Sequence, residues 1–259
     1  MNISICCPSY KRPIVETLKY IPFCKVYVDG KEFEEYKKYN PEGNIIRCAD
    51  GVQGNLCRVR NYILNEEFKN GADVVMIIDD DMEGLYLWQE NENNKIKKRK
   101  IKTEEIIDFV DKYSNICKDL GFYFWGGNCN QDAMSYMEYN PFSFSRYIGG
   151  PLQIFLKGNE CFYDETLPLK EDYDMTLQQC NKYRGCFRVN FLTYNVKQSE
   201  QVGGCATYRN MEREKSQFEL LQKKWGGDIV KMDKSNKGRT DKKKIFDYNP
   251  IIKVPIKGI

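Results

Sequence analysis

Short apolar runs separated by polar residues dominate the first third of the chain and predict strands. Four such runs cover residues 3–7, 25–28, 44–48 and 74–78. The last of them, Val-Val-Met-Ile-Ile, is too short for an amphipathic helix, and its uniform apolarity is typical of a strand covered on both faces. These runs therefore predict a buried central sheet.

Helical spacing appears between and after these strands. Leu56, Val59 and Ile63 recur at intervals of three and four residues, which places them on one face of a helix. Another helix is predicted to begin at Thr103, and a last one to cover residues 211–225. The alternation of strands and helices predicts a doubly wound α/β sheet.

Further elements complete the predicted organisation. Residues 121–128 and 147–156 indicate two more strands next to glycine turns, and the polar, basic stretch 91–102 indicates an exposed loop. We expect a single domain over residues 1–225, with a basic extension, 226–259, that packs on the domain or wraps it.

Composition limits the class of protein. The chain has 259 residues, of which 41% are hydrophobic, enough for one sizeable core. No apolar run approaches the ~20 residues that cross a bilayer, and the first residues lack the pattern of a secretory signal. We expect a soluble protein with no membrane partner, located in the cytoplasm, or in the host cytoplasm if the chain is viral. The eleven cysteines have no CxxC spacing and are expected to be reduced core residues.

Histidine is absent from the chain. Its absence excludes histidine general bases, Ser-His and Cys-His nucleophile pairs, and most catalytic zinc sites. Acid–base chemistry must therefore fall to Asp, Glu, Lys, Tyr or Cys.

An acidic cluster follows the fourth predicted strand directly. Asp79, Asp80 and Asp81 come at its carboxyl end, where open α/β sheets bind ligands. Three adjacent carboxylates repel one another unless a cation or solvent relieves the repulsion, and oxygen ligands suit Mg²⁺ or Mn²⁺. The alternative is a solvated acidic turn that opens a helix.

A second acidic pair, Glu171-Asp172, comes where a loop runs into a predicted helix. In a protein without histidine, a carboxylate there is the natural general base toward a hydroxyl acceptor. The alternative is an acid pair that stabilises the positive end of the helix dipole.

Basic charge is concentrated in residues 95–102, which include Lys97, Lys98 and Arg99, and in the tail. Such runs contact nucleic-acid phosphates in some proteins and are solvated faces in others.

Four motifs occur in a defined order: Pro8-Ser9-Tyr10-Lys11-Arg12-Pro13, then Gly54-Asn55 before Arg58-Val59-Arg60-Asn61, then Ile78-Asp79-Asp80-Asp81-Met82, then Glu171-Asp172. Their order and spacing resemble the GT-A glycosyltransferases over roughly residues 1–200. In finer detail they look like the phage glycosyltransferases associated with TET/JBP-type base hydroxylases. The resemblance implies a Rossmann-like, mostly parallel sheet flanked by helices.

The resemblance also implies roles for the matching residues. By this resemblance, the nucleoside part of a UDP-sugar would be bound by Pro8, Ser9, Tyr10, Arg12 and Asp29, and further donor contacts would come from Arg58, Asn61 and Asp80. Mn²⁺ or Mg²⁺ would be held by Asp79 and Asp81. If the reaction inverts the anomeric centre, the acceptor would be deprotonated by Asp172, beside Glu171. Many GT-A enzymes complete the metal shell with a late histidine. In this chain the diphosphate, water or another side chain must fill that place.

The activity implied is the metal-dependent transfer of a sugar, glucose or another hexose, from a UDP-sugar to a hydroxymethylated pyrimidine such as 5-hydroxymethylcytosine in double-stranded DNA. A DNA acceptor would account for the basic run, whose lysines would meet phosphates. One alternative is a glycosyltransferase with a protein or glycan acceptor, and another is a non-catalytic module that binds nucleotide or DNA.

Overall fold

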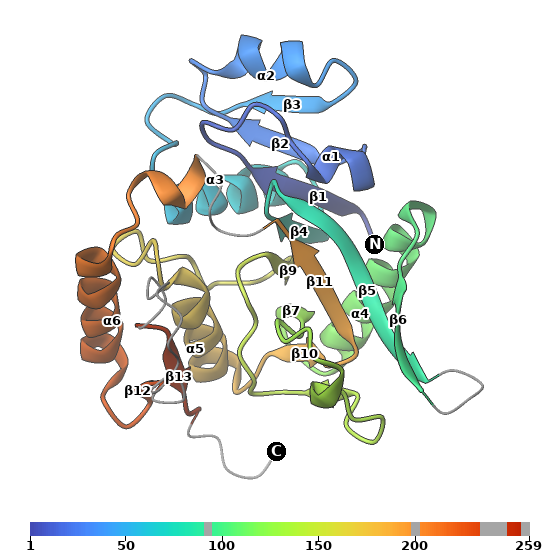
Figure 1. The fold of residues 1–259 in the computed structure, drawn as a ribbon, viewed down its shortest axis with the longest axis vertical. Coiled ribbons are helices and arrows are strands. Elements are labelled where there is room, and N and C mark those ends of the chain that lie inside the picture. Colours follow the sequence, from blue (N-terminus) through green and yellow to red (C-terminus); the bar gives the residue numbers. More distant parts are fainter. Residues whose placement is uncertain (91–94, 198–202, 234–247, 255–259) are drawn as a thin grey trace.

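A central sheet forms the middle of the molecule (Figure 1). The computed structural model describes residues 1–90, 95–197, 203–233 and 248–254. The strands of this sheet are β1 Ile3–Pro8, β2 Lys25–Val28, β3 Asn44–Arg47, β4 Val74–Ile78, β7 Phe124–Gly127, β8 Phe142–Ser143, β9 Leu152–Leu156 and β10 Phe187–Val189. Across the sheet they are ordered β3-β2-β1-β4-β9-β7-β10-β8.

Strand direction decides which loops meet at one edge of this sheet. The strands β8 and β9 run against all the others, so the predicted α/β class and mostly parallel sheet are confirmed. Because β9 lies antiparallel between β4 and β7, its first residue, Leu152, pairs with Ile78 at the end of β4. The loop that precedes β9 therefore reaches the edge where β1 and β4 end.

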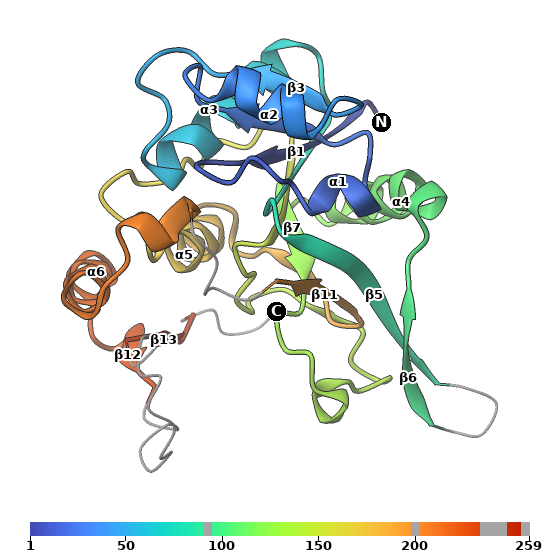
Figure 2. The same cartoon turned by 45° about the horizontal axis from the view of Figure 1, so that its top comes forward.

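Helices cover both faces of the sheet (Figure 2). Along β4, Val74, Met76 and Ile78 face one core, whereas Val75 and Ile77 face the other, as the two-residue period of a strand requires. The first core includes side chains of α1 Thr17–Tyr20, α2 Phe33–Tyr39 and α4 Ile106–Asp119, and the second includes those of α3 Leu56–Lys69 and α5 Glu171–Tyr183.

A second, smaller sheet consists of β5 Met82–Glu90, β6 Ile96–Lys100 and β11 Leu192–Val196. The prediction of a loop over residues 91–102 is therefore wrong for residues 96–100, which pair antiparallel with β5; residues 91–94 lie outside the described residues. The sequence of this strand lacks the alternation of apolar and polar residues typical of strands, because its basic side chains pack on aromatic rings. Lys98 Nζ lies 4.8 Å from the centre of the Trp88 ring, and Lys100 Nζ lies 4.5 Å from that of Tyr20.

The cysteines are free thiols, as predicted from their spacing. Cys6 and Cys117, for example, are fully buried in strand β1 and helix α4. Burial raises the pKa of both thiols above the usual range, so they remain protonated and unreactive.

The C-terminal part of the chain packs beside α5. Helix α6 Met211–Trp225 is followed by the strand pair β12 Val230–Met232 and β13 Pro250–Ile252, and the three share an apolar cluster with Leu167 and Leu177. Under α6, Lys170 and Glu214 form an ion pair at 2.5 Å whose side chains are 2% and 1% exposed. The basic residues of the tail between positions 234 and 247 lie outside the described residues.

Among the helices in the described ranges, none combines the length and the apolarity needed to cross a membrane.

The Lys170–Glu214 pair gives a test of how α6 is anchored. Glu214→Ala should lower the free energy of unfolding by about 3–5 kcal/mol, because it leaves the buried Lys170 without its carboxylate. Urea denaturation followed by circular dichroism measures the change. Glu219→Ala, which removes an exposed pair with Lys215 on the same helix, should change stability by less than about 0.5 kcal/mol. Equal losses in the two variants would contradict the anchoring role.

Candidate functional site

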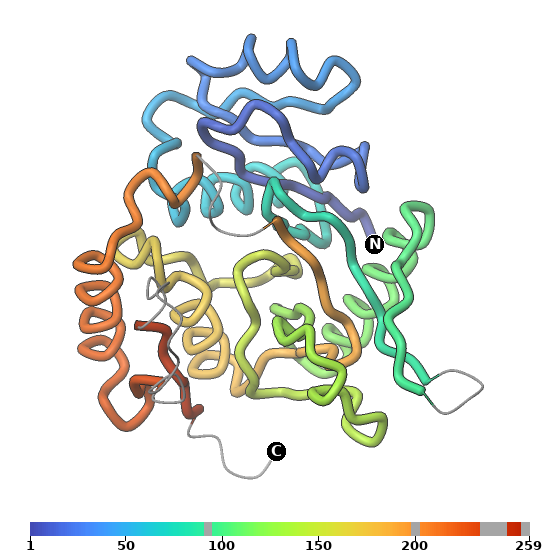
Figure 3. The backbone as a smooth tube through the Cα atoms, viewed as in Figure 1, coloured from blue at the N-terminus to red at the C-terminus, as the bar shows by residue number. Residues whose placement is uncertain are grey.

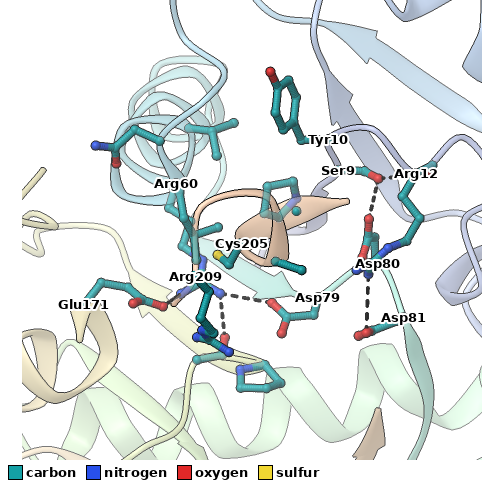
Figure 4. A pocket seen from close by; sticks show the side chains of 18 of the residues that line it. Ser9, Tyr10, Arg12, Arg60, Asp79, Asp80, Asp81, Glu171, Cys205 and Arg209 are labelled. Carbon is teal, nitrogen blue, oxygen red and sulfur yellow. Dashed lines mark hydrogen bonds and ion pairs between the residues drawn. The ribbon is translucent and has the colours of Figure 1, made fainter. Parts of the chain in front are cut away.

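A cavity of about 300 Å³ lies at the edge of the sheet where β1 and β4 end (Figure 4). Parallel strands of an α/β sheet bind ligands at this edge. Its walls come from the loop after β1, the acids after β4, the start of α3, the loop before β9, the start of α5 and segment 203–209. The cavity brings together a large part of the residues predicted from the sequence: Pro8, Ser9, Tyr10, Arg12, Asp79, Asp80, Asp81, Glu171 and Asp172.

Asp80 ties the loop after β1 to the end of β4. Ser9 Oγ donates to Asp80 Oδ2, and Arg12 Nη1 lies 2.5 Å from Oδ1. The Tyr36 hydroxyl completes the network, because it accepts from Arg12 N at 3.0 Å and lies 2.9 Å from Ser9 Oγ. Asp80 therefore acts as an anchor of the loop, and its contact with a donor stays a prediction.

Asp79 and Asp81 flank this anchor and line the cavity. Arg12 Nη1 lies 3.3 Å from Asp81 Oδ2. Burial, followed by the charges of Asp79 and Asp80, raises the pKa of Asp81 to about 7. Burial raises the pKa of Asp80 to about 6, although Arg12 opposes the shift. Burial and mutual repulsion thus disfavour the charged forms of Asp80 and Asp81.

This donor set fits a hard divalent cation. Asp79 and Asp81 offer carboxylate oxygens only, which Mg²⁺ and Mn²⁺ prefer, and a cation would relieve the repulsion that adds to burial in raising the pKa of Asp81. Within residues 1–90, 95–197, 203–233 and 248–254, no group of three or more Asp, Glu, Cys or His side chains is arranged to hold a metal. A site that takes one or two carboxylates and completes its shell with diphosphate and water needs no third side chain.

Arg60 is the central residue of the site that sequence reasoning did not single out. Its side chain is 1% exposed, yet Nη2 donates to Asp79 Oδ1 and to the Gly150 carbonyl, both at 3.0 Å. Nη1 donates to Glu171 Oε1 at 3.2 Å. One guanidinium therefore links the acids after β4 to the acidic start of α5. The only local signal was an arginine between apolar positions of the helix, on the side of Val59 and Ile63.

The acidic pair at the start of α5 is divided between two environments. Glu171 is buried against Arg60, and burial together with the charge of Asp172 raises the pKa of Glu171 to about 8. Asp172 is half-buried at the cavity wall, where it accepts hydrogen bonds from the Tyr147 hydroxyl and from Gly150 N. A side chain at position 150 would crowd the pair, since a Cβ would lie 3.3 Å from Glu171 Oε1.

Segment 203–209 forms a wall of the cavity that no sequence motif predicted. It contains the 3-10 turn Gly204–Thr207, and the tube view shows it beside the start of α3 before the chain enters α6 (Figure 3). Gly204 N donates to the Tyr10 carbonyl at 2.8 Å. Gly203 has φ of 103°, and a Cβ there would lie 2.6 Å from the Lys11 carbonyl oxygen, so the close approach requires glycine.

The remaining predicted residues do not line the cavity. Arg58 forms an ion pair with Glu165 at 2.9 Å, and Asn61 donates to the Tyr163 carbonyl at 2.8 Å. Leu56, Val59 and Arg60 of this helix line the cavity, whereas Arg58 and Asn61 contact the loop before α5, and the contact of these two side chains with a donor stays a prediction. The other outlying residues are Asp29, at the end of β2, and Lys97, Lys98 and Arg99, on β6.

The strained carboxylate of Asp81 gives a test of this electrostatic picture. Its folded pKa of about 7 lies above the ordinary 3.8, so ionisation destabilises the fold, and the stability present at low pH is lost as pH rises through 7. Asp81→Asn should therefore raise the Tm in metal-free buffer at pH 8 by about 2–6 °C, with a gain that shrinks toward pH 4. Scanning calorimetry measures both. Asp50→Asn, in an exposed turn, should change nothing; an unchanged Tm for Asp81→Asn would show that its charge is already compensated.

Solved structures similar to this chain are distant. A protein of Desulfovibrio desulfuricans G20 named as a nucleotide-diphospho-sugar transferase has 10% identity and a TM-score of 0.44, covering 86% of this chain and 97% of that chain. The mannose-1-phosphate geranyltransferase of Thermus thermophilus has 8% identity and a TM-score of 0.42, covering 76% of each chain. The A197 protein from STIV has 11% identity and a TM-score of 0.41, covering 78% and 89%. Likenesses this distant carry no argument about activity.

The family comparison is more specific. No curated protein matches the chain. Residues 22–204 match the model of the TET-associated glycosyltransferase family, and this range contains the helix α3 motif, the acids after β4 and the acidic start of α5. Because the match spans well over half of the chain, the protein belongs to the TET-associated glycosyltransferases, and the predicted GT-A type fold and glycosyltransferase class are confirmed.

Proposed function

We propose that this glycosyltransferase moves a hexose from a UDP-sugar to the hydroxymethyl group of a hydroxymethylated pyrimidine in DNA, with the help of a divalent cation. The observation that carries the proposal is the meeting of Asp79, Asp81 and Asp172 in one cavity with the loop after β1. Sugar transfer needs a charge-neutralising site for a diphosphate and a base for a hydroxyl, and the two acidic groups of this cavity suit these two tasks.

The donor would lie between the loop after β1 and the acids after β4. Pro8, Ser9 and Tyr10 line the side of the cavity formed by the end of β1 and would contact the nucleoside. Asp79 and Asp81 would hold Mn²⁺ or Mg²⁺ against the diphosphate. When bound, the cation would stabilise the charge that develops on the leaving diphosphate.

Asp172 would act as the general base. As the acceptor oxygen bonds to the anomeric carbon, the bond to the diphosphate breaks, and the proton of the acceptor hydroxyl passes to the Asp172 carboxylate. A base and a leaving group on opposite sides of the sugar would invert the anomeric centre. Glu171, held by Arg60 at 3.2 Å, would keep the start of α5 in place beside the base.

A DNA acceptor would be held in part by the β5–β6 hairpin, which leaves the site directly after Asp81. Lys97 is exposed on β6, opposite Gln89. Lys98 packs on Trp88, and Arg99 forms an ion pair with Glu105 at 2.8 Å. Lys97 is therefore the member of this trio best placed to meet a phosphate without reading sequence.

The contacts of the same hairpin favour one alternative acceptor. Because Arg99 and Lys98 engage other protein groups, the basic run offers less charge to DNA than its sequence suggests. A protein or glycan acceptor would need no such charge. A non-catalytic binding module is disfavoured by the three carboxylates that share the cavity.

The acceptor and donor are tested together by mass spectrometry. Duplex DNA containing 5-hydroxymethylcytosine or 5-hydroxymethyluracil would be incubated with the protein, Mn²⁺ and each of a panel of UDP-sugars, and the nucleosides then analysed. We expect a hexose-sized mass gain with one donor and none when EDTA removes the cation. Release of UDP without any gain on DNA would shift the acceptor to a protein or glycan, and no release with any acceptor would refute the proposed transfer.

The proposed base is tested by Asp172→Asn. The amide cannot take the acceptor proton, so kcat should fall by about 100-fold or more, while affinity for the UDP-sugar, measured by calorimetry, should stay within about twofold. Asp119→Asn, at the exposed end of α4, is the matched control and should transfer normally. Transfer by Asp172→Asn at the normal rate would remove this residue from the mechanism.

A further inference from the structure

The Asp172 carboxylate is held from three directions. The Tyr147 hydroxyl donates to Oδ2, and Gly150 N donates to the same oxygen at 3.1 Å. Tyr173 N donates to Oδ1 at 2.9 Å. Two of these donors come from the loop before β9, which reaches α5 only because β9 runs antiparallel to β4. Nothing in the sequence pattern gave Tyr147 this role.

Tyr147 is itself held firmly. Its ring stacks on that of Tyr173 with centres 4.2 Å apart and planes inclined by 13°. Arg188 Nη1 donates to the Tyr147 carbonyl at 3.3 Å. Burial, followed by the charge of Asp172, raises the pKa of the Tyr147 phenol well above its usual value, so the hydroxyl stays protonated and remains a donor.

We propose that Tyr147 is a positioning residue for the general base: its hydroxyl fixes the Asp172 carboxylate so that the lone pair of Oδ1 that Tyr173 N leaves open faces the acceptor hydroxyl. This inference rests on the proposed function of Asp172. Tyr147 keeps its own proton throughout, and the proton taken from the acceptor ends on Asp172. A hydrogen bond of this kind does for the carboxylate what an Asp partner does for a catalytic histidine, a residue type that this chain lacks.

The same hydrogen bond stabilises the negative charge of the Asp172 carboxylate. A hydrogen-bond donor to a carboxylate favours its charged form, and removal of the donor weakens that preference. The titratable groups around Asp172 are Glu171 and Tyr173 on α5, Tyr147 before β9, Cys129 after β7, Tyr163 before α5 and Tyr194 on β11. The pKa values of the tyrosines and of Cys129 are raised, which keeps them neutral in the assay range. Glu171 is therefore the neighbour whose own titration must be removed from the comparison by a variant.

Tyr147→Phe tests the inference because it keeps the stacked ring and removes only the hydroxyl. We expect kcat to fall by about 10- to 100-fold, since a mobile base loses its alignment, and KM for the UDP-sugar to stay within about twofold. The acid limb of the kcat profile should move to higher pH. A Glu171→Gln background should show the same movement, which excludes Glu171 as its source.

The matched control is Tyr183→Phe, which removes a hydroxyl at the end of α5, the helix that carries Asp172. The Tyr183 hydroxyl lies outside the cavity lining and accepts a hydrogen bond from Glu160 N. It should leave kcat and the acid limb unchanged. A ring-fluorinated tyrosine at position 147 keeps the fold and donates more strongly, so it should move the acid limb to lower pH; it decides the matter if Tyr147→Phe folds poorly.

Two outcomes are distinguishable. If the wild-type protein transfers the sugar and Tyr147→Phe has the same kcat and the same acid limb, the positioning role alone is overturned. Absence of transfer by the wild-type protein with every acceptor would instead overturn the proposed function on which that role rests.

Discussion

The buried guanidinium of Arg60 is the constraint on which the site depends. It lies between Asp79 and Glu171, at 3.0 and 3.2 Å, and also holds the Gly150 carbonyl. A charge at 1% exposure is tolerated only when partners surround it, and removal of one partner leaves the others uncompensated. The end of β4, the start of α5 and the loop before β9 therefore form one electrostatic unit, which keeps the acids after β4 and the acidic start of α5 at a fixed separation.

The direction of one strand makes this unit possible. In a fully parallel sheet, the loop before one strand lies at the opposite edge from the loops that follow the neighbouring strands. Because β9 is antiparallel between β4 and β7, the loop carrying Tyr147 and Gly150 lies at the same edge as Asp79. The backbone of this loop thus supplies a carbonyl to Arg60 and an N–H to Asp172.

A histidine-free enzyme must tune carboxylates instead. The structure does so by burial and by placing acids side by side, which raises the pKa of Asp81 to about 7 and that of Glu171 to about 8. Asp172 is treated differently, with hydrogen-bond donors on both of its oxygens. Neighbouring acids with different surroundings can take different roles, one structural and one catalytic.

The sequence by itself determined the strands of the first third, the helical face of α3 and the position of Asp79 at a strand end. These features depend on local periodicity and on the residues that directly follow a run of buried apolar residues. Only the tertiary structure decided that Arg60, and not Arg58, faces the cavity, that residues 96–100 form a strand, and that Tyr147 meets Asp172. Each of these depends on a partner far along the chain, and no local pattern encodes the long-range pairing that brings such partners together.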